Sequence, residues 1–252
     1  MKRFLIILSA LMVTSAAFAQ AKVVAHRGFW KTDGSAQNSI RSLVKADSIG
    51  CWGAEFDVWM TADGKLVVNH DPTIDGLTIE TAKAKEVTAK KLVNGENVPL
   101  LEAYLKKFEE LPNIHVVCEL KSHTNKKQEA KAVKQILKMV RKHRLTDRVT
   151  YITFSQEATL GFVKDAPKGT EVYYLNGDWT PQQLKDNGCA GLDYSLNAIR
   201  KHPEWIEQCH NLGMKVNIWT VNKAEDLRWC IDSGADFITT NEPELLQQML
   251  AK

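Results

Sequence analysis

Residues 53–71 read GAEFDVWMTADGKLVVNHD, an apolar strand-like run that carries two acids and then turns back into a second apolar run. Because side chains alternate between the two faces of a strand, Glu55 and Asp57 share one face. Two carboxylates held this close repel and raise each other's pKa unless a cation lies between them. The turn ADGK predicts that LVVNHD pairs back on the first strand and ends at His70.

Similar β-rich runs occur along the rest of the chain, and amphipathic segments separate them. In residues 127–143, for example, Val133, Ile136, Leu137 and Val140 recur at helical spacing. The predicted strands cover residues 22–26, 53–58, 114–120, 149–154, 171–175, 190–194, 215–220 and 236–240. Strands that alternate with helices through eight units are typical of a TIM (β/α)8 barrel, and the alternative is a doubly wound open α/β sheet.

One segment, residues 60–100, interrupts this alternation. After the paired-back strand it continues as a polar excursion, TIDGLTIETAKAKEVTAKKLVNGENVPL, before the next helical pattern. We interpret it as a short insertion after the second strand. In a barrel such an insertion is expected on the face that carries the active-site loops.

The first 21 residues, MKRFLIILSALMVTSAAFAQA, have the pattern of a secretory signal peptide. Lys2 and Arg3 precede a short apolar run, and small residues at Ala19 and Ala21 end two A-x-A patterns. An uncleaved membrane anchor is the alternative, although the run is short for a membrane span. We therefore expect a periplasmic or extracellular protein whose mature domain covers residues 22–252 and does not insert stably into a membrane.

Charge and cysteine content exclude several classes of protein. Removing Lys2 and Arg3 from the 33 basic side chains leaves 31 against 30 acidic ones, so nothing indicates a nucleic-acid partner. The five cysteines are odd in number and contain no CxxC pair, which disfavours a disulfide framework or a thiolate metal site. We expect most of them to be small core residues.

Three carboxylates lie at the predicted carboxyl ends of two strands, where a parallel barrel gathers its site residues. They are Glu55, Asp57 and Glu119. Carboxylate oxygens suit a hard divalent ion such as Ca²⁺ or Mg²⁺, whereas a zinc site would recruit histidines or thiols. A salt-bridged acid pair near the barrel end is the alternative explanation for Glu55 and Asp57.

Basic residues follow the same strand ends. His26 and His70 could take and give a proton, which the splitting of an ester requires. Arg27 is a forked donor suited to phosphate oxygens, and Lys121 adds a point charge. A cation, Arg27 and Lys121 in one pocket favour an anionic centre, and phosphate fits best.

Taken together and in order, these segments closely resemble the glycerophosphodiester phosphodiesterase family over about residues 21–250. The segments are AHRG, QN, GAEFDVWMTADGKLVVNHD, NVPLLEAYL, CELK, ITFS, VNIWTVN and GADFITTNEP. The resemblance implies a TIM barrel enzyme with an insertion after the second strand. It also implies a small-molecule substrate, a glycerol-linked phosphodiester such as glycerophosphocholine, cleaved to sn-glycerol 3-phosphate and an alcohol.

The resemblance also implies roles for individual residues. These are His26 and His70 as acid and base, Glu55, Asp57 and Glu119 as Ca²⁺ or Mg²⁺ ligands, Arg27 and Lys121 near the phosphate, and Trp219 as an aromatic wall. A core tryptophan is the alternative for Trp219.

The sequence departs from the family pattern in three places. Gln37 stands where the family usually has Glu, so we expect a weaker hold on the ion or a different leaving group. The insertion between residues 72 and 98 is short and lacks the family's usual Arg/Thr/Gly-rich loop, a difference that bears on the lid and on leaving-group specificity. Asn241 replaces a common Asp, and we expect this to change loop hydrogen bonds more than catalysis.

Two other functions stay open at the level of sequence. One is a phosphodiesterase or phospholipase D-like lyase that acts on other lipid or sugar phosphodiesters on the same barrel, because a fold does not determine a substrate. The other is a noncatalytic binder of phosphorylated ligands. The sequence indicates neither the oligomeric state nor which histidine is the acid.

Overall fold

The computed structural model of the protein describes residues 20–251. The predicted signal peptide therefore lies almost entirely outside the described residues. Within residues 20–251, no helix combines the length and apolar character that a membrane crossing requires. Export of the chain stays a prediction from sequence.

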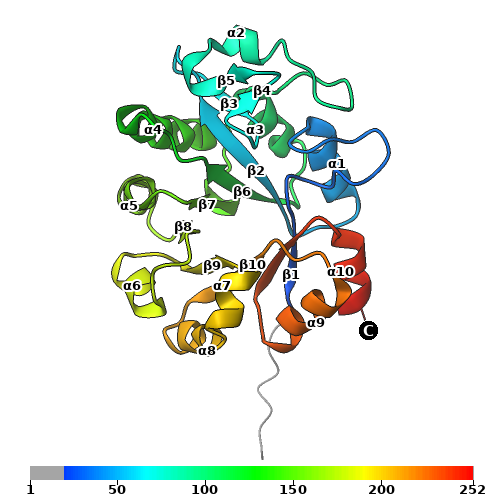
Figure 1. The fold of residues 1–252 in the computed structure, drawn as a ribbon, viewed down its shortest axis with the longest axis vertical. Coiled ribbons are helices and arrows are strands. Elements are labelled where there is room, and N and C mark those ends of the chain that lie inside the picture. Colours follow the sequence, from blue (N-terminus) through cyan, green and yellow to red (C-terminus); the bar gives the residue numbers. More distant parts are fainter. Residues whose placement is uncertain (1–19, 252) are drawn as a thin grey trace, which may run out of the picture.

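Eight parallel strands form a nearly closed barrel at the centre of the molecule, with helices around it (Figure 1). The strands are β1 (Lys22–Ala25), β2 (Gly53–Met60), β6 (His115–Leu120), β7 (Val149–Thr153), β8 (Glu171–Tyr174), β9 (Gly191–Ser195), β10 (Lys215–Trp219) and β11 (Phe237–Thr240). Their hydrogen-bonded order is β8-β7-β6-β2-β1-β11-β10-β9. The first strand of the chain, β1, pairs with the last, β11, as in a closed (β/α)8 barrel, and the predicted TIM fold is confirmed.

The barrel has a seam between β8 and β9. These two strands end the hydrogen-bonded order and share no ladder. At the seam the Ala190 amide donates to the Val172 carbonyl at 2.9 Å. The half of the barrel around β1, β2 and β6 is therefore more completely hydrogen-bonded than the half at the seam.

Helices connect the strands and pack on the outside of the barrel (Figure 1). They are α1 (Ile40–Ser48), α3 (Leu101–Glu109), α4 (Lys126–Lys142), α5 (Gln156–Asp165), α6 (Pro181–Asp186), α7 (Leu196–Lys201), α8 (Glu204–Asn211), α9 (Ala224–Asp232) and α10 (Pro243–Leu250). Side-chain caps begin several of them: Ser39, Asn125, Ser155, Thr180 and Ser195 each accept a hydrogen bond from a first-turn amide. Each cap stabilises its helix by ~1 kcal/mol.

Two apolar layers hold the barrel together. The larger one lies between strands and helices, where Phe56 of β2 contacts Tyr104 and Phe108 of α3. The smaller one fills the barrel interior with side chains of the opposite strand faces: Val24, Val117, Ile152, Tyr173, Leu175 and Phe237. All five cysteines are buried free thiols. The prediction that most of them are core residues is therefore confirmed.

The segment between β2 and α3 is the predicted insertion. β2 extends two residues beyond its predicted end because Trp59 and Met60 pair with β3 (Leu66–Val68), which runs antiparallel to β2. Beyond β3 lie the short pair β4 (Thr73–Ile74) and β5 (Leu77–Thr78), the 3-10 turn η1 (Ile79–Thr81) and α2 (Ala84–Val87). A separate small core supports them: Trp59, Val67, Ile79, Ala82, Val87 and Val98.

Gly191 of β9 provides a test of the barrel packing. A Cβ at this position would lie 2.0 Å from the Lys215 carbonyl oxygen of β10. We expect Gly191→Ala to lower the free energy of unfolding by roughly 1–3 kcal/mol or more, because neither strand can move without breaking the ladder. Urea unfolding followed by circular dichroism measures the change.

The matched control is Gly161→Ala in α5, where the new Cβ would meet Val133 at an ordinary 3.5 Å. Alanine favours a helix over glycine by up to about 1 kcal/mol. The control should therefore be neutral or stabilising, and equal stability changes in the two variants would contradict the packing account.

Candidate active site

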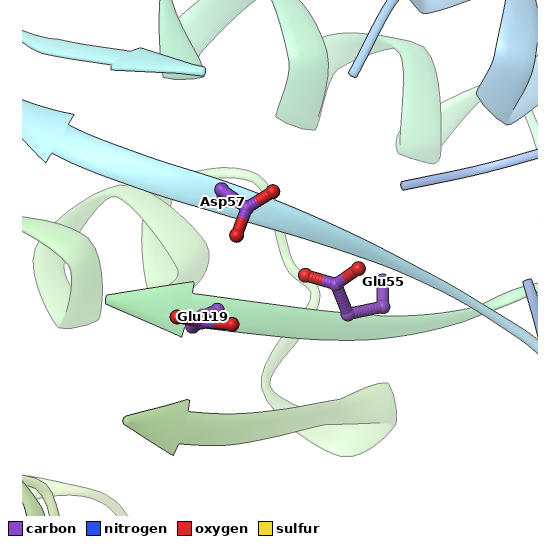
Figure 2. A group of neighbouring side chains, drawn as sticks. All are labelled: Glu55, Asp57 and Glu119. Atoms are coloured by element: carbon purple, nitrogen blue, oxygen red, sulfur yellow. The ribbon is translucent and has the colours of Figure 1, made fainter. Parts of the chain in front are cut away.

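Three buried carboxylates meet at the carboxyl ends of β2 and β6. Asp57 lies directly opposite Glu119 in the register of the two strands, and Glu55 is two residues earlier on β2. Each residue offers an oxygen atom, and these three oxygens lie within 4.8 Å of one another. Figure 2 shows Glu55 and Asp57 on β2 beside Glu119 on the neighbouring strand. The structure thus brings the three predicted ligands together.

Burial and mutual repulsion make it costly for all three carboxyl groups to be ionised at once. Burial, and then the charges of Asp57 and Glu119, raise the pKa of Glu55 well above its ordinary value. Burial and the Asp57 charge raise the pKa of Glu119 to about 7. Glu55 Oε1 is buried with no hydrogen-bond partner. An orphaned oxygen among three oxygen donors fits a hard divalent cation.

Two cations lie beside the cluster. Lys121 Nζ is 2.7 Å from Glu119 Oε1 and 3.2 Å from Asp57 Oδ1, and Arg27 Nε is 3.7 Å from Asp57 Oδ2. Burial alone would raise the pKa of Asp57, but Lys121 and other nearby cationic groups hold it below its ordinary value. Asp57 is therefore the member of the cluster that stays ionised most readily.

The turn after β1 places a backbone donor on the cluster. Arg27 and Gly28 both have positive φ, 58° and 74°. This conformation aims the Arg27 amide at Glu55 Oε2, at 2.8 Å. It is costly for most residues, and at position 28 a Cβ would lie 2.4 Å from Ser42 Oγ. The HRG sequence therefore encodes a turn as well as two functional side chains.

Asn38 and Gln37 contact different partners. Asn38 is buried, donates from Nδ2 to Asp57 Oδ2 at 2.8 Å, and accepts from the Asp57 amide at 3.1 Å. Gln37 Oε1 instead accepts from Arg27 Nη1 at 2.5 Å. The substitution that we expected to weaken ion binding thus lies against the guanidinium, and Asn38 orients the carboxylate.

The two predicted acid–base histidines have different hydrogen-bond partners. His26 Nδ1 lies 2.8 Å from Asn241 Oδ1, and its Nε2 is 3.9 Å from Glu55 Oε2. Burial, and then the Arg27 charge, lower the pKa of His26 to about 4. His70 Nδ1 lies 2.7 Å from Asp71 Oδ1, and burial lowers its pKa as well. Asn241, expected to affect loop hydrogen bonds, contacts His26 directly.

A cavity of about 120 Å³ joins these groups. Its lining includes seven of the eight predicted site residues: His26, Arg27, Glu55, His70, Glu119, Lys121 and Trp219. The eighth, Asp57, contacts Lys121 from within the cluster.

Part of the cavity wall is apolar, formed by Ile152, Phe154, Leu175 and Trp219. Trp219 is half-buried, and its ring meets Phe154 edge-on with centroids 5.6 Å apart. Its Nε1 donates to the Asp193 carbonyl at 3.1 Å. Leu175 completes this wall. Trp219 therefore lines the cavity and also packs against the barrel interior.

A polar layer that forms another part of the cavity wall was not identified in the sequence. Asn217 Nδ2 donates to Asp193 Oδ1 at 2.7 Å and to Thr239 Oγ1 at 2.9 Å, across β9, β10 and β11. Burial raises the pKa of Asp193 to about 8. Inward positions of strands with period two could have indicated this layer, because each of the three residues interrupts an apolar strand face.

A second hydrogen-bond network holds the backbone around Lys121. His123 Nδ1 lies 2.7 Å from the Lys121 carbonyl, and its Nε2 accepts from the Met60 amide at 2.9 Å. Glu129 of α4 accepts from the His123 amide at 2.7 Å. His123 is thus a hydrogen-bonded structural histidine that joins the ends of β2 and β6.

Comparison with known proteins gives one consistent result. The chain matches the model of the Glycerophosphoryl diester phosphodiesterase family over residues 26–245. A glycerophosphodiester phosphodiesterase from Caldanaerobacter subterraneus subsp. tengcongensis is 29% identical over 248 residues, which cover 91% of this chain and 98% of that protein.

Solved structures agree with the fold. A crystal structure of a glycerophosphodiester phosphodiesterase from Parabacteroides distasonis is 46% identical, covers 92% of this chain and 97% of its own, and superposes with a TM-score of 0.90. An Oleispira antarctica phosphodiesterase in complex with the product sn-glycerol-3-phosphate has the same fold, with a TM-score of 0.79 and 21% identity over 92% of this chain and 98% of its own.

Asp193 gives the site a test that depends on pH. The pKa of Asp193 is 3.8 in an unperturbed chain and about 8 in the folded protein. At pH values between these two, Asp193 keeps a proton in the folded protein that it has released in the unfolded chain. The free energy of unfolding should therefore fall as pH rises through this window, by up to about 1.4 kcal/mol per unit for one proton. Asp193→Asn keeps the acceptor for Asn217 and removes the titration. Urea unfolding from pH 5 to 8 should show a shallower fall for the variant, and parallel profiles would contradict the assignment.

Proposed function

Because this chain belongs to the glycerophosphoryl diester phosphodiesterase family, we propose that it hydrolyses glycerophosphodiesters to sn-glycerol 3-phosphate and an alcohol. One observation supports this most strongly. Three buried carboxylates, two imidazoles and two cationic side chains converge on one small cavity of the barrel. These groups can bind a divalent ion, hold a phosphate and exchange protons, as metal-assisted cleavage of a phosphodiester requires.

The proposed cofactor is Ca²⁺ or Mg²⁺, held by Glu55, Asp57 and Glu119. Bound there, the ion would offset negative charge on the substrate phosphate. The ligand set favours these hard ions over zinc because all three of its members are carboxylate oxygens, and no thiol or imidazole belongs to the cluster among the described residues.

The chain's own side chains supply binding and proton transfer. Arg27 and Lys121 would bind phosphate oxygens, since both lie beside the cluster and line the cavity. His26 and His70 would exchange protons with the attacking and leaving oxygens. Trp219 and Phe154 would contact the apolar part of the substrate and exclude water.

Ion binding can be tested apart from activity. In EDTA-treated protein, Ca²⁺ or Mg²⁺ should raise the melting temperature, because a ligand of the folded state alone stabilises by about 2.7 kcal/mol at one hundred times its Kd. Glu55→Gln should abolish this shift and leave the ion-free protein at least as stable as the parent, since it removes a buried like charge.

Glu225→Gln, a change of an exposed acid on α9, is the matched control and should keep the shift. An equal ion-dependent shift in Glu55→Gln would rule out the proposed ligand set.

Activity is tested with purified protein, Ca²⁺ or Mg²⁺, and a panel that includes glycerophosphocholine and glycerophosphoethanolamine. Release of sn-glycerol 3-phosphate is measured by an enzyme-coupled assay. His26→Ala and His70→Ala should each lower kcat by roughly 10²–10⁴-fold with little change in melting temperature. His202→Ala, at an exposed position after α7, should keep the parent rate.

The products separate the alternatives. A phospholipase D-like lyase acting on other phosphodiesters would not release sn-glycerol 3-phosphate from this panel. A noncatalytic binder would show no ion-dependent turnover of any substrate. Either result would overturn the proposed hydrolysis.

A further inference from the structure

Asn241 receives two hydrogen bonds at one atom. Its Oδ1 lies 2.8 Å from His26 Nδ1 and accepts from Trp30 Nε1 at 3.1 Å. The backbone N–H of Asn241 donates to Asn222 Oδ1 at 2.8 Å, and this bond fixes the backbone that carries the Asn241 side chain. The three groups therefore form a short chain of contacts that ends at a histidine of the cavity.

The tryptophan decides which way this chain of hydrogen bonds runs. An indole nitrogen only donates, so the atom of Asn241 that faces Trp30 has to be the carbonyl oxygen. If the side-chain amide were reversed, two N–H groups would face each other. The same oxygen faces His26, and His26 Nδ1 must then carry a hydrogen atom to form the bond.

This arrangement leaves the other ring nitrogen without a hydrogen in the neutral imidazole. Nε2 is turned toward the carboxylates, 3.9 Å from Glu55 Oε2, which is beyond hydrogen-bond distance. The His26 side chain is 18% exposed and lines the cavity. A lone pair is thus presented to the space where the substrate would bind.

A second contact keeps the two loops together. Lys31, next to Trp30, forms an ion pair with Glu242, next to Asn241. The loop after β1 is therefore attached to the loop after β11 by two adjacent pairs of residues. These contacts hold the Trp30 indole over the Asn241 carbonyl group.

We propose that Trp30 and Asn241 are positioning residues that hold His26 in the Nδ1–H tautomer, so that Nε2 accepts the proton of the attacking hydroxyl. This inference rests on the proposed function. As the new O–P bond forms, that proton passes to Nε2, and the P–O bond to the departing alcohol breaks. The alcohol oxygen takes a proton from His70. The Nδ1 atom of His70 contacts the Asp71 carboxylate, whereas that of His26 contacts the side-chain amide oxygen of Asn241.

Nuclear magnetic resonance of the imidazole tests the tautomer directly. In protein labelled with ¹⁵N at histidine, the His26 signals are assigned by their absence in His26→Gln. In the neutral His26 ring we expect Nδ1 to carry the hydrogen and Nε2 to be unprotonated. Asn241→Asp should keep this pattern because a carboxylate only accepts, whereas Asn241→Leu should lose it.

Kinetics supply the second readout. Trp30→Phe keeps an aromatic side chain but removes the indole N–H donor, so the side-chain amide of Asn241 is free to reverse. We expect kcat to fall roughly ten- to hundred-fold in Trp30→Phe and in Asn241→Leu, with KM nearly unchanged. Trp229→Phe, in α9 outside the barrel and against Arg200, is the matched control and should keep the parent kcat.

Two results would overturn the inference. One is a parent spectrum in which Nε2 of neutral His26 carries the hydrogen. The other is a parent kcat in both Trp30→Phe and Asn241→Leu while His26→Ala is inactive. If instead His26→Ala keeps full activity, the proposed function of His26 fails. The spectrum of the parent protein still reports the tautomer in that case.

Discussion

Repulsion among Glu55, Asp57 and Glu119 is the constraint around which the site is arranged. Their oxygens lie within 4.8 Å of one another in a buried setting, which is unfavourable by itself. The surroundings offset part of it: the Arg27 amide donates to Glu55, Asn38 donates to Asp57, and Lys121 bridges two of the acids. An oxygen of Glu55 is still left without a partner. A divalent cation bound there would contact that oxygen and offset the repulsion among the three acids.

The barrel makes this arrangement possible because strand register sets it. Asp57 stands opposite Glu119 in the β2–β6 ladder, and a slip of one residue would turn the acids to the outer face. The same strand continues into the hairpin with β3, whose following loop carries His70. Two of the three carboxylates and one histidine are therefore positioned by β2 and the hairpin that extends it, and β6 positions the third carboxylate.

Sequence alone predicted much of this structure. The eight strands lie within one or two residues of their predicted bounds, because apolar β-rich runs and helical spacing are local signals. The convergence of acids and histidines followed from their places at strand ends. The Trp30–Asn241–His26 contacts could not be predicted, since they join loops more than 200 residues apart that meet only when β1 pairs with β11. The layer formed by Asp193, Asn217 and Thr239 depends on closure in the same way.

The seam between β8 and β9 gives the barrel an unequal stiffness. The carboxylates lie on β2 and β6, inside the continuous ladder, whereas Leu175 follows β8 and Asp193 lies on β9. Because β8 and β9 share no ladder, their facing edges have fewer backbone hydrogen bonds than β2 and β6, and deuterium should replace their amide hydrogens faster. Expansion at this edge would enlarge the cavity beside Leu175 and Asp193 for a bulkier molecule while Glu55, Asp57 and Glu119 stay in place.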